Sequence, residues 1–170
     1  MHLIDKASDL ISRALKLVAA VWLFAVSLMI LADVVARGLF DRPILGIKEL
    51  VANSIVIIAF LQLPYTVRIG AMLRAEIIDG WLPPTGLRIL LAVAYVLGAV
   101  LFFLIVVASW EPMLRAWATG EYEGEGGLRV ITYPVRTVIV AGSVLATVNF
   151  ILLAIGTLRG APLPSSAPAH

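Results

Sequence analysis

The stretch ILLAVAYVLGAVLFFLIVVASW, residues 89–110, decides the fold of this protein. It contains 22 consecutive residues without a charged side chain, close to the roughly 20 apolar residues that an α-helix needs to cross a bilayer. Three further charge-free runs are of similar length: Leu17–Ala32, Leu50–Val67 and Thr137–Leu158. Because all four runs are continuously apolar and do not alternate, they favour helices over the strands of a membrane β-barrel. The sequence therefore predicts four transmembrane helices.

The composition of the whole chain agrees with this prediction. Of 170 residues, 61% are hydrophobic and 14% are charged, and the mean hydropathy is +1.02, whereas soluble domains carry about 25% charged residues. The formal net charge of +2 leaves no dominating basic patch, which excludes nucleic-acid binding. Without cysteine, the chain has no disulfide, iron–sulfur cluster or thiolate metal site.

We expect an all-α integral membrane protein with a single four-helix transmembrane domain over residues 1–160. The spans are expected near residues 15–36, 49–67, 87–110 and 134–158. Residues 161–170, rich in proline and serine, are expected to form a disordered tail. The glycine- and glutamate-rich connection after the third span is expected to be a flexible solvent loop.

Two amphipathic segments flank these spans. From Leu3 to Leu15 apolar residues recur at helical spacing, while Asp9, Ser12 and other polar residues take the opposite face. This pattern predicts an N-terminal interfacial helix that runs into the first span. Between the second and third spans, an apolar stripe that begins at Ile69 predicts a short surface helix, ended by the prolines that follow.

The orientation is decided by basic residues. An even number of spans puts both termini on one side, and seven basic residues lie there against six opposite. The positive-inside rule therefore favours cytoplasmic termini by a narrow margin.

The spans lack the residues of membrane chemistry. Transporters and intramembrane enzymes usually carry an ionisable group near mid-span, yet Asp33 and Glu49 lie at span ends, and the histidines are His2 and His170. We therefore expect no enzymatic activity, cofactor or metal, and no coupling to an ion gradient by this chain alone. Among the polar residues within the spans, Asn149 is expected to lie near the middle of the bilayer. We interpret it as making an interhelical hydrogen bond in preference to a substrate contact.

Charges gather where the first span turns into the second. Asp33 and Arg37 are four residues apart, a spacing that allows an ion pair on one helix face. Asp41, Arg42 and Glu49 follow. This turn is interpreted as a solvated interfacial turn, as a docking surface, or as a charged pair that fixes the hairpin.

The residues of this turn also carry a family resemblance. The run RGLFDRPILGIKEL, residues 37–50, resembles the hairpin between the first two spans of the small, DctQ-like membrane subunit of tripartite ATP-independent periplasmic (TRAP) transporters. Further on, Leu73-Arg74-Ala-Glu76 and Trp81-Leu82-Pro83 resemble that family's cytoplasmic segment, although Met72 stands where a histidine is common. The resemblance covers residues 1–159, with specific motifs only over 37–83.

The resemblance implies an accessory role. Such a subunit lies in the bacterial inner membrane with cytoplasmic termini and binds a larger membrane subunit, which carries the substrate and sodium sites. A periplasmic solute-binding protein delivers the substrate, an organic acid such as a dicarboxylate or a sugar acid. This chain is thus expected to be a scaffold in sodium-coupled uptake, with the large subunit, the binding protein and the bilayer as its partners.

Roles for individual residues follow from the same resemblance. Hairpin geometry or subunit contact is assigned to Arg37, Phe40, Pro43 and Glu49. We assign Arg74, Glu76, Leu82 and Pro83 to the expected surface helix on the cytoplasmic side. Docking of the binding protein is assigned to Asp41 and Arg42.

Other functions compete with this interpretation. The nearest alternative is the four-span accessory subunit of a tripartite tricarboxylate transporter. That subunit has a similar helper role and is distinguished by the partner that it binds. A membrane anchor of an electron-transfer or other complex is disfavoured because no span histidine is available for haem. A homo-oligomeric small transporter or channel is disfavoured by the missing central charge.

Overall fold

The computed structural model describes residues 2–41, 44, 46–69, 84–123 and 130–159. Its helices are α1 His2–Phe40, α2 Ile47–Arg68, α3 Pro84–Thr119 and α4 Tyr133–Leu158. Each contains a stretch long and apolar enough to cross a membrane, which confirms the prediction of an all-helical protein with four such helices. Two short strands, β1 Tyr122–Glu123 and β2 Val130–Ile131, lie between α3 and α4.

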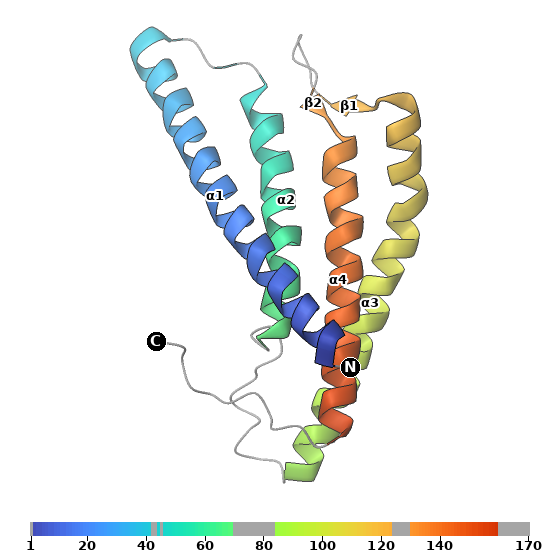
Figure 1. Ribbon diagram of the computed structural model, residues 1–170. Coiled ribbons are helices and arrows are strands. Elements are labelled where there is room, and N and C mark those ends of the chain that lie inside the picture. The colour runs from blue at the N-terminus through green and yellow to red at the C-terminus, as the bar shows by residue number, and fades with distance from the viewer. Residues whose placement is uncertain (1, 42–43, 45, 70–83, 124–129, 160–170) are drawn as a thin grey trace.

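The helices form two hairpins that meet along α2 and α4 (Figure 1). In one hairpin α1 packs on α2, and in the other α3 packs on α4. We name the end where α1 begins and α4 ends the terminal end, and the opposite end the hairpin end. Because α1 is inclined to the other helices, it approaches α4 only near the terminal end (Figure 1).

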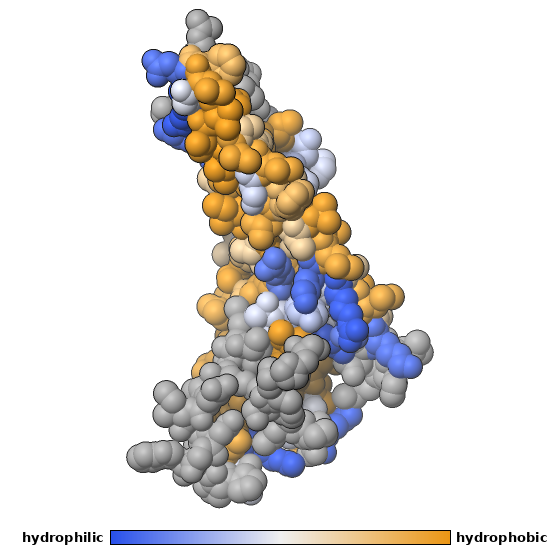
Figure 2. Space-filling view, turned by 90° about the vertical axis from the view of Figure 1, so that its left-hand side faces the viewer, coloured by the Kyte–Doolittle hydropathy of each residue, from blue (hydrophilic) through white to orange (hydrophobic). Residues whose placement is uncertain are grey.

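The N-terminal segment does not form a separate interfacial helix. Instead, α1 is one helix of 39 residues, about 58 Å long at 1.5 Å per residue, nearly twice the roughly 30 Å hydrocarbon core. No glycine or proline interrupts it before Gly38, so nothing in its sequence separates the amphipathic part from the span. The outer face of α1 is apolar along most of its length, with polar atoms gathered toward both ends (Figure 2).

The crossing of α2 and α4 depends on a glycine and a proline. Pro64 lies inside α2 and has no N–H, so the Phe60 carbonyl lacks its usual partner one turn later. Gly142 of α4 lies against this carbonyl: a Cβ atom at Gly142 would be 2.5 Å from the Phe60 oxygen. The close approach of two helices at a small residue is the arrangement that membrane helices favour.

The core between α3 and α4 is built around Phe150, which is 3% exposed. Its ring stacks on Phe102 at a centroid distance of 5.7 Å and lies 6.4 Å from the ring of Tyr95. Gly98 provides the space, since a Cβ there would lie 2.7 Å from the Phe150 ring. A smaller cluster of Ala19, Val26 and Ile58 joins α1 to α2.

The connection after the third span is more ordered at its ends than its composition indicates. The helix α3 continues past Trp110 and through Pro112 to Thr119. β1 and β2 then pair antiparallel, with Tyr122 opposite Ile131. Residues 124–129 of the expected loop, most of the expected surface helix (residues 70–83) and the expected tail lie outside the described residues.

Candidate functional sites in the bundle

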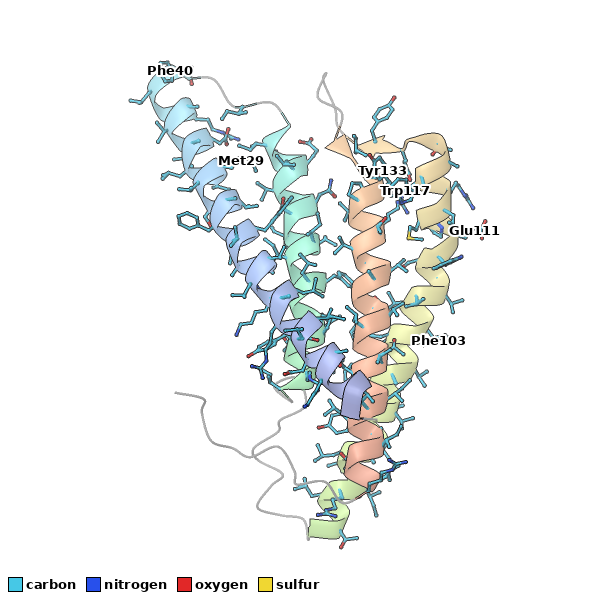
Figure 3. All side chains as sticks on the ribbon, in the orientation of Figure 1. Met29, Phe40, Phe103, Glu111, Trp117 and Tyr133 are labelled. Carbon is cyan, nitrogen blue, oxygen red and sulfur yellow. The ribbon has the colours of Figure 1, made fainter. Side chains whose placement is uncertain are left out.

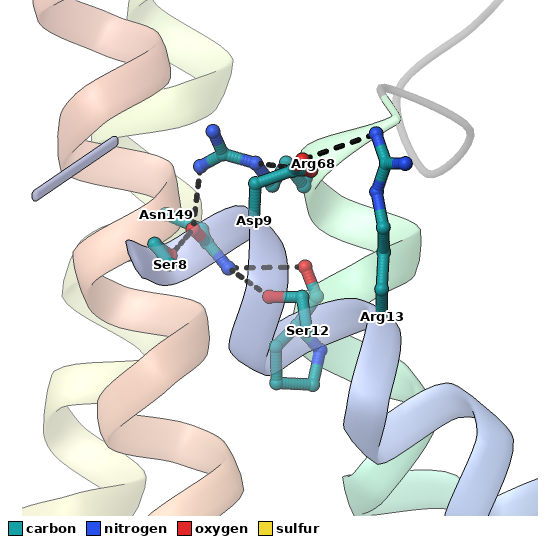
Figure 4. A network of polar contacts seen from close by, with 7 residues as sticks. Ser8, Asp9, Ser12, Arg13, Arg68 and Asn149 are labelled. Carbon is teal, nitrogen blue, oxygen red and sulfur yellow. Dashed lines mark hydrogen bonds and ion pairs between the residues drawn. The ribbon is translucent and has the colours of Figure 1, made fainter. Parts of the chain in front are cut away.

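Asn149 is the centre of a polar network where three helices meet (Figure 4). It lies on α4 and is 1% exposed. Its Oδ1 accepts hydrogen bonds from Ser8 Oγ and from Arg68 Nη1, the latter at 3.3 Å. Its Nδ2 donates to the Pro64 carbonyl at 3.0 Å and to Ser12 Oγ at 3.4 Å. We name this network, together with Asp9, the polar junction.

The spacing of residues along each helix explains why these groups meet. Ser8 and Ser12 are one turn apart on α1, as Pro64 and Arg68 are on α2, so each pair faces the same side of its helix. Ser8 is 5% exposed and Ser12 is fully buried. A buried amide without partners costs several kcal/mol in an apolar medium. Here all four groups around Asn149 are hydrogen-bonded to it, so the network joins α1, α2 and α4 without leaving the amide unpaired.

A charged rim borders the polar junction. Asp9 Oδ1 lies 3.1 Å from Arg68 Nε, and Asp9 Oδ2 lies 3.0 Å from Arg13 Nη2. The Arg68 side chain is 17% exposed, whereas that of Arg13 is 67% exposed. Solvent screening makes an exposed pair such as Asp9–Arg13 a weak contributor to stability. The pair between Asp9 and Arg68 connects two helices and is better shielded.

Asn149 lies beside the last turn of α2, and α4 continues past it to Leu158. The environment of Ser12 differs from the sequence-based expectation. Ser12 was expected on the polar face of an interfacial helix, yet it is buried against Asn149. Ser8 and Ser12 are turned inward because α2 and α4 offer polar partners for them, whereas the basic residues of the same face stay exposed. The pairing of distant segments such as Ser8 with Asn149 leaves no signal in a single sequence.

Asp33 organises the hairpin end of α1 and α2. It is 6% exposed, and its Oδ2 lies 2.6 Å from Arg37 Nη2, which confirms the ion pair predicted from spacing. Its Oδ1 accepts a hydrogen bond from the Ile44 backbone N–H at 2.9 Å. One carboxylate thus ties the end of α1 to the chain that leads into α2. Gly46, with φ of 76°, then starts α2 from a left-handed conformation that suits glycine.

Replacing Asp33 tests this connection. We expect Asp33→Ala to lower the free energy of unfolding by about 1–2 kcal/mol, because it removes both the acceptor for Ile44 and the ion pair. Asp33→Asn retains an amide oxygen for Ile44 and should cost less. Unfolding in mixed micelles, followed by circular dichroism, measures both. Equal stability of Asp33→Ala and the unmodified protein would contradict the assignment.

The other predicted residues of this turn differ in their exposure. Phe40 is 71% exposed at the tip of α1 (Figure 3). Asp41 is exposed and has a left-handed φ of 50°. Glu49 lies in the first turn of α2 and is partly buried. Six predicted residues lie outside the described part of the chain: Arg42, Pro43, Arg74, Glu76, Leu82 and Pro83.

The hairpin end of α3 and α4 is closed by side-chain contacts that the sequence did not indicate. The rings of Trp117 and Tyr133 lie 4.4 Å apart (Figure 3). The Trp117 indole also donates to Thr137 Oγ1 at 2.9 Å. Arg136 Nη2 lies 3.0 Å from Glu121 Oε2. These contacts join the extension of α3 to the start of α4.

No group of three or more histidine, aspartate or glutamate side chains comes together within the described ranges. The buried side chains of Asn149 and Asp33 are hydrogen-bonded to neighbouring helices or to the turn, whereas Asn53 Nδ2 and Ser143 Oγ are buried without a hydrogen-bond partner among the described residues. The arrangement of the polar junction and of Asp33 is therefore suited to holding helices in place.

Comparison with known proteins gives a family match. The family model described as "Tripartite ATP-independent periplasmic transporters, DctQ component" matches residues 26–160. No curated protein and no solved structure matches the chain. The family match includes Asp33, Pro64, Arg68 and Asn149, whereas Ser8, Asp9 and Ser12 precede it.

Proposed function

Because this chain belongs to the DctQ component family of the tripartite ATP-independent periplasmic transporters, we propose that it is the small scaffold subunit of such a transporter. The family is non-enzymatic, and the chain is a multi-pass membrane component of a periplasmic transporter system. The family match over residues 26–160 is the observation that carries the proposal.

The contacts of the ionisable side chains support a scaffold role. Asp33 holds a backbone N–H and Arg37, and Arg68 holds Asp9 and Asn149. The four charge-free runs of the sequence contain no acid or base that binds and releases an ion. In this proposal, coupling to sodium and movement of the substrate belong to a larger membrane subunit. The small subunit anchors the stationary part of the transporter and widens it in the bilayer.

The partners and orientation are part of the same proposal. A large TRAP membrane subunit is the direct partner, and a periplasmic solute-binding protein delivers an organic acid. The chain lies in the bacterial inner membrane with cytoplasmic termini, which the narrow excess of basic residues on that side favours. The terminal end of the bundle then faces the cytoplasm and the hairpin end faces the periplasm.

Co-purification tests the proposed function. The chain is tagged at its C-terminus, extracted gently from its native membrane and analysed by mass spectrometry. We expect a stoichiometric, very hydrophobic partner several times larger than this chain. Recovery of the chain alone, or with redox subunits, would contradict the proposal. Such a result would favour a homo-oligomeric transporter or channel, or a membrane anchor of another complex.

Roles of the predicted site residues follow from this proposal. Arg37, Phe40, Pro43 and Glu49 shape the α1–α2 hairpin or contact the large subunit; the ion pair of Arg37 with Asp33 supports the first role for that residue. Arg74, Glu76, Leu82 and Pro83 hold a surface helix on the cytoplasmic side. An unchanged yield of the complex in the Arg74→Ala, Glu76→Ala double variant would contradict that assignment.

Docking of the binding protein is proposed at Asp41 and Arg42. We expect the Asp41→Ala, Arg42→Ala double variant to assemble normally but to support slower uptake, because charge complementarity accelerates association. Uptake by membrane vesicles at limiting concentration of the binding protein measures this effect. The matched control is Glu111→Ala, Arg115→Ala, which removes an exposed pair with a 2.7 Å contact elsewhere on the protein. Equal uptake by both double variants would argue against docking at this turn.

A further inference from the structure

Basic side chains gather beside the polar junction, where α1 passes the end of α2. Three of them, Lys6, Arg13 and Lys16, are exposed on α1, and Arg68 ends α2. Figure 2 shows hydrophilic atoms below the apolar band of α1. Asp9 lies between Arg13 and Arg68 and pairs with both. The other two cations, Lys6 and Lys16, are exposed, as is Arg13.

Contacts hold three of these cations, Arg13, Lys16 and Arg68, in place. Arg68 is bound through Nε to Asp9 and through Nη1 to Asn149, so its guanidinium has a fixed orientation. Arg13 approaches Asp9 through Nη2 with its side chain 67% exposed, which leaves other donors of its planar fork turned outward. Lys16 Nζ lies 4.1 Å from the centroid of the Tyr65 ring. Ordering these long side chains, which normally opposes anion binding, has partly occurred before a ligand arrives.

The position of this group relative to the apolar surface identifies its ligand. The charge-free run of α1 begins at Leu17, immediately after Lys16. Leu17, Val18 and Val21 are 68%, 52% and 71% exposed. A ligand with an anionic group next to acyl chains can bind the basic side chains and also pack on the exposed apolar side chains of α1. An inorganic anion can bind only the basic side chains. Phosphate matches guanidinium groups through paired, charge-assisted hydrogen bonds.

We propose that Lys6, Arg13, Lys16 and Arg68 bind the phosphate of an anionic phospholipid at the terminal end of the bundle, with its acyl chains along α1. The lipid stabilises the contact of α1 with α2, because its phosphate is shared by cations of both helices. The proposal does not depend on the identity of the transporter partner.

The test compares two lipids with the same acyl chains and different headgroup charge. The full-length protein, purified in neutral detergent, is titrated with phosphatidylglycerol or phosphatidylcholine, and thermal unfolding is followed by tryptophan fluorescence. Native mass spectrometry counts the lipids retained. We expect phosphatidylglycerol to bind more tightly and to raise Tm more than phosphatidylcholine.

Charge-removing variants locate the site. Arg13→Gln, Lys16→Gln should bind phosphatidylglycerol roughly 30-fold more weakly, since each basic residue near the surface contributes about fivefold. Lys6→Gln, Lys16→Gln removes two charges without disturbing the pairs of Asp9, and it should show a similar loss even if the first variant folds poorly. The matched control is Lys48→Gln, Arg115→Gln, which removes two exposed charges near the hairpin end and should bind as the unmodified protein does.

Four results would overturn the proposal. The first is equal binding of the two lipids, and the second is an equal loss of binding in the control variant. The third is a rise in Tm with inorganic phosphate alone as large as that with phosphatidylglycerol, which would indicate a site for a free anion. Unchanged binding by Lys6→Gln, Lys16→Gln would likewise exclude this location.

Discussion

Asn149→Leu is expected to destabilise the bundle by about 1–3 kcal/mol, although leucine is the more apolar side chain. Leucine has the same branched arrangement of side-chain heavy atoms as asparagine but cannot donate or accept a hydrogen bond. The substitution therefore removes the acceptor of the Ser8 hydroxyl. It removes the amide that donates to Ser12 Oγ and to the Pro64 carbonyl. It also removes the bond from Arg68 Nη1. Unfolding in mixed micelles, followed by circular dichroism, measures the loss of stability.

Thr147→Val is the matched control on the same helix. Thr147 Oγ1 donates to the Ser143 carbonyl one turn earlier at 2.8 Å, so its hydrogen bond lies within α4 and joins no second helix. Its loss should cost less than about 0.6 kcal/mol, the average for side-chain hydrogen bonds between membrane helices. Similar stabilities of Asn149→Leu and Thr147→Val would show that the polar junction does not hold α1 to α4.

Gly142→Ala is expected to lower the free energy of unfolding by about 1–3 kcal/mol, the usual cost of overpacking a close contact. The new Cβ would lie 2.5 Å from the Phe60 carbonyl oxygen and 3.2 Å from the Phe60 Cβ. Because the nearest atom belongs to the backbone of α2, no rotation of a side chain relieves the clash. The two helices must move apart, which also weakens the bond from Asn149 to Pro64. The yield of the complex with the large subunit is expected to fall with the stability.

Substitutions at two other glycines serve as controls, and their expected losses of stability differ. A Cβ atom at Gly38 would meet no other part of the described chain within 4 Å, so Gly38→Ala should be neutral or slightly stabilising because alanine favours the helix. Gly98→Ala meets the Phe150 ring at 2.7 Å, a side chain that can rotate, and an intermediate effect is expected. Thermal unfolding of the three variants in one detergent gives the order. Equal stability of Gly142→Ala and Gly38→Ala would contradict the close crossing.

Much of the fold was predictable because hydropathy acts locally along the chain. The run over residues 89–110 needs no partner to require a helix in lipid, since its own backbone hydrogen bonds are the only ones available. The pair of Asp33 and Arg37 was predictable for a similar reason: both residues lie on one helix, and their spacing fixes their distance. The family resemblance depends on the same local motifs, and the family match agrees with it.

The candidate sites were less predictable because they depend on contacts between distant segments. The amphipathic pattern before Lys16 is compatible with a helix on the membrane surface and with one packed on its neighbours. The amide of Asn149 and the end of α2 selected the second arrangement. Asp33 was recognised as a partner of Arg37, but its bond to Ile44 required the path of the turn.

The sequence by itself determined that this protein is a set of four membrane-crossing helices and to which family it belongs, because apolar length and local motifs are written within single segments. Only the tertiary structure decided how the helices are staggered, that α1 extends back to His2, and that Ser8, Ser12 and Arg68 converge on Asn149. The physical reason is that lipid solvates all apolar faces almost equally, so hydropathy does not choose between partners. That choice depends on a few polar groups that must find one another and on the glycines that let the helices approach.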